Sequence, residues 1–423
     1  MDFSYTTERT DNGYEISITG CGSIPNGRLR IPQEIGGVPV TAIAAEAFKD
    51  RTDSKLTEVI IPEGVREIGG GAFCGCDLMS LELPVSLVRL GRNAFGGAKN
   101  LSPLESLTFK GDAPDYGGDV GLDPAKCAIY VYAGLGWGET WQGCSISRVV
   151  RYWNPVLKST LTKEGCIAVK SDTKTLEDGR WYVVQGDVTT SNLKENGAAN
   201  LILVDGATLT ANGTSGCAGI EVADGNALTI WGQNGGTGAL VATGGSDGAG
   251  IGGGRNGAGG ALTVNGGFVT ANGGNRGAGI GGGGYSGSYK SCGGCAVTVN
   301  GGTVKATGSE VGDDFGGGDT ADGGSLTIDG GSVLATHDTG NVKSAYGYVD
   351  PKNASGAKVY RVTVEGLDGL VSLGGLGDYG AVGIVPINGQ LCLWLPNGNY
   401  SFTANGTAYT ATVAGGPTTA TAQ

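Results

Sequence analysis

Two cysteines three positions apart, Cys292 and Cys295, have the spacing of a redox or metal motif. A single CxxC supplies only two of the four ligands that a structural zinc ion takes, and redox work needs a thioredoxin-like context that this sequence lacks. The chain has 10 cysteines but only 1 histidine, which excludes sites built from several imidazoles. We predict a local disulfide or free thiols at Cys292 and Cys295, with metal or redox chemistry as the alternative.

Four aspartates surround one glycine corner: Asp313, Asp314, Asp319 and Asp322. Calcium binds where several oxygens converge at about 2.3 to 2.6 Å. A solvated turn explains the same four residues, and both interpretations stay open. Calcium is the one candidate cofactor, and we expect no other.

Exposed aromatic rings on a shallow face commonly bind sugars, and Trp231, Tyr285 and Tyr289 are candidates for that role. An aromatic side chain that caps a corner is the alternative. We predict no catalytic residues, because no pair of carboxylates is marked by a motif. A polysaccharide lyase would also need a basic residue beside clustered acids. The basic residues between 201 and 330 are Arg255, Arg276, Lys290 and Lys305, and no two of them occupy matching positions of the repeat.

Charge and hydropathy restrict the partners. With 28 basic and 40 acidic residues the net charge is −12, and without a basic cluster there is no footprint for nucleic acid. No apolar run approaches the roughly 18 residues of a membrane span. The first residues lack the layout of a signal peptide and begin in strand-like sequence, and no LPxTG-like ending is present. We expect a monomer whose leader and anchor lie outside this sequence.

The elements that position these residues come from two different repeats. Residues 56–76 and 78–98 align at an offset of 22, and the nine matched positions of the first copy are Leu56, Val59, Ile61, Pro62, Val65, Ile68, Gly69, Ala72 and Phe73. Each unit reads as a short strand, a proline that stops it and an apolar corner. Such a unit buries its apolar side only by stacking on a neighbour.

This pattern resembles the BspA-type leucine-rich repeats of bacterial surface proteins over residues 14–110. The signature is carried by Ile61-Pro62, Val65, Ile68-Gly69, Ala72-Phe73 and Cys76, and the second copy departs from it with Ala98 in place of the cysteine. We predict repeats over 1–111 and a closing unit over 112–153. The resemblance implies attachment to host or bacterial surfaces.

After a connecting segment, 154–180, the period changes. Leu228, Leu262, Val297 and Leu326 recur at spacings of 34, 35 and 29 residues. Two further apolar ladders keep the same register, one through Leu240, Val269, Val304 and Val333 and one through Ile251, Ile280 and Phe315. Three ladders predict three strands per coil, which is the arrangement of a parallel β-helix.

Glycine accounts for 42 of residues 201–330, and that window contains no proline. Corners between strands need a positive φ or a close backbone approach, and Asn265, Asn300 and Asp329 precede glycine pairs at one such corner. We predict a glycine-rich parallel β-helix over 181–343, and residues 181–336 resemble the glycine-rich β-helices found in predicted surface proteins of gut bacteria.

Residues 357–423 alternate as short strands around the turn Pro396-Asn-Gly398, and this pattern predicts a small antiparallel β-sandwich. The fold class is therefore mainly β: a leucine-rich repeat solenoid, a right-handed parallel β-helix and a small sandwich. We predict a cell-surface or secreted adhesion protein that presents solenoid faces to polysaccharides or to host or bacterial surface proteins. The alternatives are a calcium-assisted polysaccharide-binding or polysaccharide-cleaving protein and a structural stalk.

Overall fold

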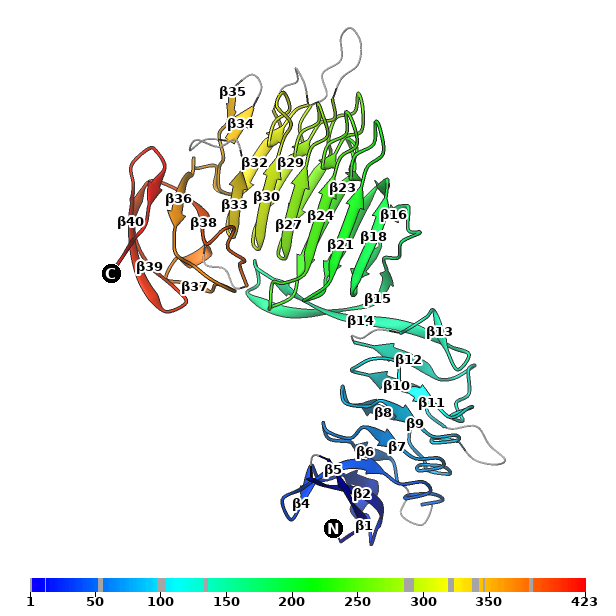
Figure 1. Ribbon diagram of the computed structural model, residues 1–423. Coiled ribbons are helices and arrows are strands. Elements are labelled where there is room, and N and C mark those ends of the chain that lie inside the picture. Colours follow the sequence, from blue (N-terminus) through cyan, green and yellow to red (C-terminus); the bar gives the residue numbers. More distant parts are fainter. Residues whose placement is uncertain are drawn as a thin grey trace. The chain divides into compact units, whose positions relative to one another are not determined.

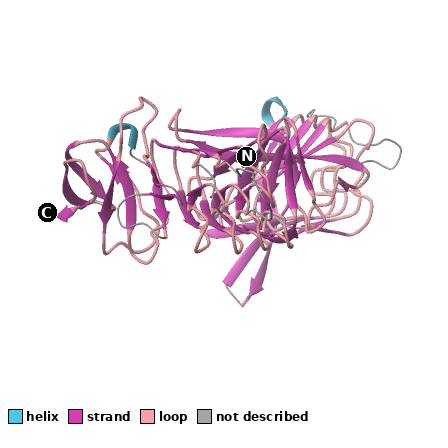
Figure 2. Cartoon of the chain, turned by 90° about the horizontal axis from the view of Figure 1, so that it is seen from above, coloured by secondary structure: helices cyan, strands magenta, loops and turns pink. Residues whose placement is uncertain are grey.

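The computed structural model of the protein describes residues 2–11, 13–51, 56–96, 103–132, 136–284, 293–318, 323–336, 342–344, 347–379 and 383–423. The chain forms two compact units, Met1–Val150 and Arg151–Gln423 (Figure 1). Strands make up nearly all of the regular structure (Figure 2). Among the described residues the helical segments are two 3₁₀ turns, η1 (Pro25–Gly27) and η2 (Gly377–Tyr379). No helix in this part of the chain has the length and apolarity to cross a membrane.

The first unit is a solenoid with two parallel faces. One face begins with an antiparallel hairpin, and its strands are β1 (Phe3–Thr10), β2 (Gly13–Cys21), β5 (Val38–Ile43), β7 (Glu67–Ile68), β9 (Arg89–Leu90) and β11 (Asp115–Tyr116), with β4 (Glu34–Ile35) beside β5. On the other face, β3 (Arg28–Arg30) pairs with β6 (Glu58–Ile60), and β8 (Ser80–Leu83), β10 (Ser106–Phe109), β12 (Ala128–Val131) and β14 (Cys144–Asn154) follow in parallel. The short β13 (Thr140–Trp141) forms a hairpin with β14.

Stacked phenylalanines fill the corners of this solenoid. Phe48 and Phe73 stack at 5.5 Å between ring centroids, and Phe73 and Phe95 at 6.5 Å. All three rings are buried. The backbone follows the same ladder, because the N–H of Phe48 donates to the carbonyl of Ala72 and that of Phe73 to the carbonyl of Ala94, both at 2.8 Å. The repeat predicted from the sequence over 56–98 therefore stacks coil on coil.

The second unit contains a three-sheet solenoid, to which each full coil contributes one strand per sheet. The first sheet runs through β15 (Ser159–Ala168), β17 (Trp181–Val184), β20 (Ala198–Leu203), β23 (Ala227–Gly232), β26 (Ala261–Val264), β29 (Ala296–Val299) and β32 (Ser325–Ile328). The second contains β16 (Thr175–Glu177), β19 (Leu193–Asn196), β22 (Ile220–Glu221), β25 (Ile251–Gly252), β28 (Ile280–Gly281) and β31 (Phe315–Gly316). The third contains β18 (Asp187–Ser191), β21 (Thr208–Asn212), β24 (Ala239–Thr243), β27 (Phe268–Asn272), β30 (Thr303–Thr307) and β33 (Ser332–Ala335).

The apolar ladders predicted for this unit are confirmed in register. Leu228 pairs with Leu262, which pairs with Val297, and Val297 pairs with Leu326. Ile251, Ile280 and Phe315 form the equivalent ladder on the second sheet. Their side chains are buried in one continuous core. Like residues therefore stack along the solenoid axis, as the spacing of the repeats predicts.

Glycines at the corners leave room for the neighbouring coil. A Cβ built on Gly277 would lie 2.0 Å from the carbonyl oxygen of Gly248, and one on Gly248 would lie 1.9 Å from that of Cys217. Any larger residue would displace backbone at these positions. At the Asn-Gly-Gly corner the positive φ belongs to the second glycine, 82° at Gly267 and 75° at Gly302. Asn265 and Asn300, which precede these glycine pairs, do not have a positive φ, because the glycine already supplies it.

The last coil is covered by a C-terminal module with two sheets around one core. One sheet contains β36 (Tyr360–Val364), β38 (Leu391–Leu395) and β41 (Thr418–Thr419), and the other contains β37 (Leu373–Gly374), β39 (Gly398–Ala404), β40 (Thr407–Val413) and β42 (Thr421–Ala422). The hairpin of β34 (Val342–Ser344) and β35 (Gly347–Val349) precedes it. The indole N–H of Trp394 donates to the carbonyl of Val333 at 3.0 Å, and the backbone N–H of Cys392 donates to Ser332 Oγ at 3.0 Å. These buried contacts join the module to the end of the solenoid.

Candidate functional site

A groove of about 800 Å³ lies on the second unit. Four chain segments far apart in sequence line it: the turn after β14, the outer face of β29 and β32, the segment that leads into the C-terminal module, and η2. Its lining residues are Pro155, Val156, Lys158, Thr298, Asn300, Thr327, Asp329, Asn353, Ala354, Ser355 and Tyr379. The volume lies within the range of roughly 300 to 1,000 Å³ that ligand sites occupy.

The turn between β14 and β15 forms one wall of the groove. Asn154 starts the turn, because its Oδ1 accepts hydrogen bonds from the N–H groups of Val156 at 3.1 Å and Leu157 at 2.9 Å. This is an Asx turn, for which Asn-Pro is a sequence signal. Lys158 adopts a positive φ of 50°, and its ammonium donates to the carbonyl of Gly377 at 3.3 Å. The turn is thereby held next to η2.

Asn353 organises the opposite wall. Its Nδ2 donates to the hydroxyl of Tyr379 at 2.6 Å, and its Oδ1 accepts from the hydroxyl of Ser355 and the N–H of Ala357, both at 2.8 Å. The carboxylate of Asp329 accepts the N–H of Ala354 at 2.8 Å. These bonds fix the polar groups before any ligand arrives, and preorganisation of this kind lowers the entropic cost of binding.

The floor of the groove is a polar ladder. Thr298 and Thr327 are in register on adjacent strands, with side chains pointing away from the apolar core. Lys158 and Asp329 are the charged residues of the lining, and the other polar groups are hydroxyls and amides. A surface of hydroxyls, amides and one tyrosine ring suits a neutral, hydroxyl-rich ligand, because each group can donate or accept and the ring offers an apolar face.

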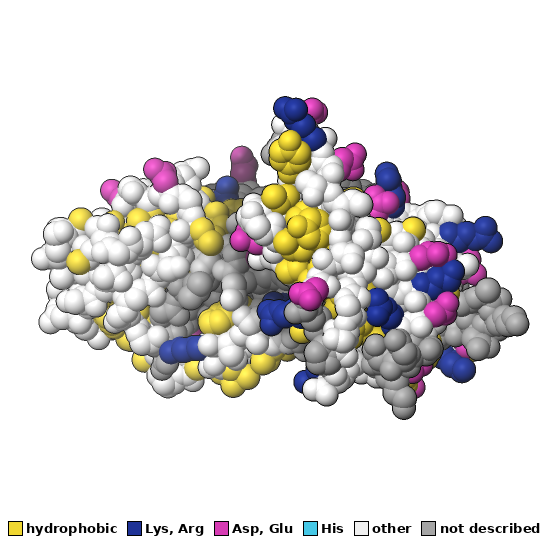
Figure 3. Space-filling model, turned by 90° about the horizontal axis from the view of Figure 1, so that it is seen from below, with side chains coloured by type: hydrophobic (Ala, Val, Ile, Leu, Met, Phe, Trp, Pro, Cys, Tyr) yellow, Lys and Arg dark blue, Asp and Glu magenta, His cyan; other side chains and the backbone are white. Residues whose placement is uncertain are grey.

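The neighbouring C-terminal module is poor in charge. Residues 383–423 contain no Lys, Arg, Asp or Glu. At the left end of Figure 3, where this module lies, the drawn face is mostly white with scattered hydrophobic side chains and a few acidic and basic ones. This part of the second unit therefore exerts little long-range electrostatic attraction on a charged ligand, and recognition there depends on short-range contacts.

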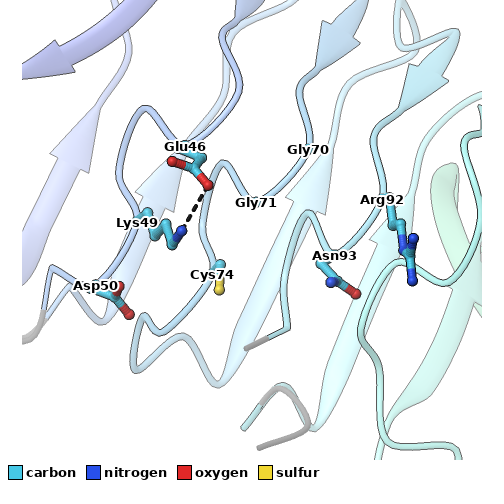
Figure 4. Close-up of a pocket in the computed structure, with 8 residues that line it drawn as sticks. All are labelled: Glu46, Lys49, Asp50, Gly70, Gly71, Cys74, Arg92 and Asn93. Carbon is cyan, nitrogen blue, oxygen red and sulfur yellow. Dashed lines mark hydrogen bonds and ion pairs between the residues drawn. The ribbon is translucent and has the colours of Figure 1, made fainter. Parts of the chain in front are cut away.

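A smaller pocket of about 390 Å³ lies on the first unit, across three successive corners of the repeats (Figure 4). Its lining residues are Glu46, Lys49, Asp50, Gly70, Gly71, Cys74, Arg92 and Asn93. The ammonium of Lys49 and the carboxylate of Glu46 form an ion pair at 2.7 Å. This hydrogen bond raises the pKa of Lys49 above its ordinary value. The pocket is lined by charged side chains and is open to solvent. Its walls are the equivalent corners of successive repeats.

Trp231 lies in an aromatic cluster with Trp181 and Tyr152. Its ring stacks on Trp181 at 5.8 Å and meets Tyr152 edge-on at 4.8 Å, while its indole N–H donates to Asn200 Oδ1 at 3.0 Å. Lys163 lies 5.3 Å from the centre of the Trp181 ring. Trp231 lies within β23, not at a corner, with its side chain on the face away from the apolar interior, and it is half-buried in contacts with the chain itself. Tyr285 and Tyr289 lie outside the described residues, so sugar binding by the three aromatics stays a prediction.

The predicted calcium ligands are described in part. Asp313 and Asp314 are fully buried, and their carboxylates accept backbone N–H groups from Gly317 at 2.8 Å and Gly308 at 2.7 Å. Asp319 and Asp322 lie outside the described residues. Within the described ranges, no group of three or more His, Cys, Asp or Glu side chains is placed to hold a metal ion.

Cys295 is buried inside the second solenoid, and its burial raises the pKa of the thiol to about 12. Cys292 lies outside the described residues, so the predicted local disulfide stays a prediction. A thiol with a pKa this high is a poor nucleophile at neutral pH.

Sequence reasoning missed the groove residues Asn353, Ser355, Tyr379 and Lys158. They stand in turns of segments that the repeat pattern does not include, and the groove exists only because the module packs beside the last coils. The Asn154-Pro155 dipeptide predicts a turn, but nothing in the sequence predicts which coils this turn approaches.

Residues 40–112 match the family model of the BspA type Leucine rich repeat region, in 6 copies. This confirms the leucine-rich repeat part of the resemblance drawn from the sequence, and the first unit carries this repeat. A search of the curated proteins finds no match.

Three solved structures are similar to parts of the chain. A leucine-rich repeat protein from Bacteroides capillosus is 22% identical, with a TM-score of 0.24, over 31% of this chain and 100% of that one. A leucine rich cell surface protein from Faecalibacterium prausnitzii is 16% identical, with a TM-score of 0.20, over 60% and 81%. A leucine-rich repeat protein from Bacteroides ovatus is 14% identical, with a TM-score of 0.24, over 72% and 84%.

Proposed function

We propose that this chain is a bacterial cell-surface or secreted binding protein, and that the groove of its second unit holds a segment of polysaccharide. The observation that carries the proposal is the lining of the groove, in which hydroxyls and amides of the β29 and β32 region and of residues 353–355 converge beside the ring of Tyr379. Neutral polysaccharides are chains of hydroxyl-bearing rings with apolar ring faces. They match such a surface better than a phosphate backbone does, and the net charge of −12 also opposes nucleic acid.

The two solenoids have the form that binding of extended ligands requires, because successive coils repeat side chains at fixed spacing. We propose that the three-sheet solenoid is a right-handed parallel β-helix and that the C-terminal module is a small antiparallel sandwich. The BspA-type repeat supports an extracellular setting and a binding role without catalysis. A protein partner for the first unit and a structural stalk are the competing accounts.

The test is a panel of immobilised plant, mucosal and bacterial polysaccharides, with calcium or with a chelator. Retention of the protein and the appearance of new chain ends are recorded together. We expect retention without cleavage, unaffected by the chelator. Cleavage, with or without calcium, would contradict the binding account. Absence of retention on the whole panel would contradict the polysaccharide proposal.

Tyr379→Ala serves as the groove variant in this panel, because it removes both the ring and the hydroxyl that accepts from Asn353. Tyr14→Ala is its matched control, since the side chain of Tyr14 is exposed on β2 of the first unit. We expect Tyr379→Ala to lose retention and Tyr14→Ala to keep it. Equal retention of the two variants would remove the groove from the account even if the protein binds a polysaccharide.

A further inference from the structure

Two buried cysteines lie opposite each other where the first unit ends. Ile129 of β12 and Ile146 of β14 are paired in parallel register. Cys144 stands two positions before Ile146 on β14, and Cys127 stands two positions before Ile129, directly before β12, so the same register continued by two residues sets them side by side. Side chains two residues apart point to the same face of a strand, and both cysteines belong with Ile129 to the apolar core. Their exposed fractions are 4% and 0%.

The general spacing of neighbouring strands suits a covalent bond between two such cysteines. Neighbouring strands lie about 4.8 Å apart, and the Cα atoms of bonded cysteines are separated by roughly 4.4 to 6.8 Å. The two thiols lie within hydrogen-bonding reach of each other. The hairpin of β13 and β14 fixes Cys144, since Trp141 pairs with Cys144 across the turn Gln142-Gly143, whose φ angles are 52° and 78°.

We propose that Cys127 and Cys144 form a disulfide when the chain folds in an oxidising compartment, and that this bond locks the closing unit of the first solenoid. The structure describes both residues as free thiols. The oxidising compartment rests on the proposed extracellular function. The pairing of the two cysteines does not, and it is tested independently of any ligand.

The oxidant is a disulfide-bearing compound, such as oxidised glutathione or a thiol–disulfide oxidoreductase. One protein thiolate attacks a sulfur of the oxidant's disulfide, which forms a mixed disulfide and releases one oxidant thiolate. The second protein thiolate attacks the protein sulfur of the mixed disulfide, which forms the Cys127–Cys144 bond and releases the second oxidant thiolate. Two protons pass from the protein thiols to the released thiolates, and two electrons reduce the oxidant.

Burial raises the pKa of Cys127 to about 12 and also raises that of Cys144. Because exchange proceeds through the thiolate, the bond should form while the chain is still folding and the sulfurs are accessible. The experiment therefore lets the protein fold in the presence of the oxidant.

The full chain is produced by export to a bacterial periplasm, and a second sample is refolded from denaturant with oxidised and reduced glutathione. Free thiols are alkylated under denaturing conditions before trypsin digestion. No Lys or Arg lies between Lys126 and Arg148, so both cysteines fall on the single peptide 127–148. We expect this peptide to be two hydrogens lighter than its reduced form and to carry no alkyl group. Alkylation of both cysteines, or a bond from either one to another cysteine, would overturn the proposal.

Stability provides the second readout. A disulfide that closes a loop of this length stabilises a protein enough to raise Tm by on the order of 5 to 10 °C. We expect the reductant to lower the Tm of the first unit by that amount in the wild type and in Cys217→Ser, which changes a partly exposed cysteine of the other unit. In Cys127→Ser the reductant should have no such effect. A shift that survives in Cys127→Ser would contradict the pairing.

Discussion

The two solenoids stack their coils by different means. In the first unit, phenylalanine rings fill the corners, and a glycine is needed where coils touch: a Cβ on Gly69 would lie 2.4 Å from the backbone nitrogen of Ala45. In the second unit, backbone atoms of the neighbouring coil fill the inside of each corner. The carbonyl oxygens of Cys217, Gly248 and Gly277 each occupy the space that a Cβ on the glycine of the next coil would take.

This difference determines what each solenoid tolerates. A ring-filled corner loses buried apolar area when the ring is truncated, but its backbone can remain in place. A backbone-filled corner cannot accept even a methyl group without moving a neighbouring coil. The corners of the first unit thus combine buried rings with close glycines, whereas the corners of the second unit depend on glycine alone, which explains why residues 201–330 hold 42 glycines.

The largest expected effect comes from Gly277→Ala. The new methyl group would meet the carbonyl of Gly248, and we expect a loss of more than about 4 kcal/mol in the free energy of unfolding of the second unit. Denaturant unfolding measures it. Gly416→Ala is the control, because nothing lies within 4 Å of its Cβ and its φ is not in the left-handed region; it should change stability by less than about 1 kcal/mol. Equal effects would refute the account of the glycine corners.

Phe73→Ala should destabilise the first unit by about 3 kcal/mol or slightly more, because Phe73 stands between two stacked rings. We expect the free energy of unfolding of the second unit to be unchanged, because Phe73 belongs to the core of the first unit. Unfolding followed separately for the two units tests both statements, with Tyr14→Ala as the exposed aromatic control. A loss below about 1 kcal/mol would mean that the ring stack contributes little to the first solenoid.

Glu195 makes the second unit sensitive to pH. It points into the apolar interior, and burial raises its pKa to about 7, against a smaller opposite effect of nearby N–H groups. One of these, the N–H of Ala227, donates to the carbonyl of Gly197 at 2.8 Å and is not free for the carboxylate. Neither carboxyl oxygen has a hydrogen-bond partner among the described residues.

The direction of the pH effect on stability depends on whether Glu195 ionises at a lower pH in the unfolded chain or in the folded protein. The unfolded chain loses this proton near pH 4.5, whereas the folded protein retains it to about pH 7, so stability falls between these values as pH rises. We expect Glu195→Gln to be more stable than wild type at pH 8 by about 1 to 3 kcal/mol, with the difference vanishing near pH 4. Unfolding curves across this range test it. A gain that does not change with pH would contradict the buried carboxyl.

The smallest effect belongs to the exposed ion pairs of the first unit. Arg28 and Glu58 approach to 2.8 Å, with side chains 74% and 47% exposed. We expect Arg28→Ala to cost about 0.5 kcal/mol at low salt and nothing measurable at about 1 M salt. A larger cost that persists in high salt would show that charge pairing contributes to the first solenoid alongside its rings.

The sequence predicts the stacked parts of the molecule well. Leu228, Leu262 and Leu326 repeat at a period that only stacking explains, and their register is confirmed. The groove could not be predicted in this way. Asn353 and Tyr379 line it only because the C-terminal module packs against the last coils, and this contact occurs once in the chain. Repeats encode nearest-neighbour contacts, whereas a site between non-repeating segments depends on contacts that occur once.

The most direct test of the polysaccharide proposal is a calorimetric titration with an oligosaccharide cut from a polysaccharide that the panel retains. Thr298→Arg places a long side chain on the groove floor, and Thr229→Arg places it on the same ladder two coils earlier, outside the groove lining. We predict that Thr298→Arg weakens binding by about tenfold or more, while Thr229→Arg stays within about twofold of wild type. Equal affinity of the two variants would contradict the assignment of the groove as the binding site.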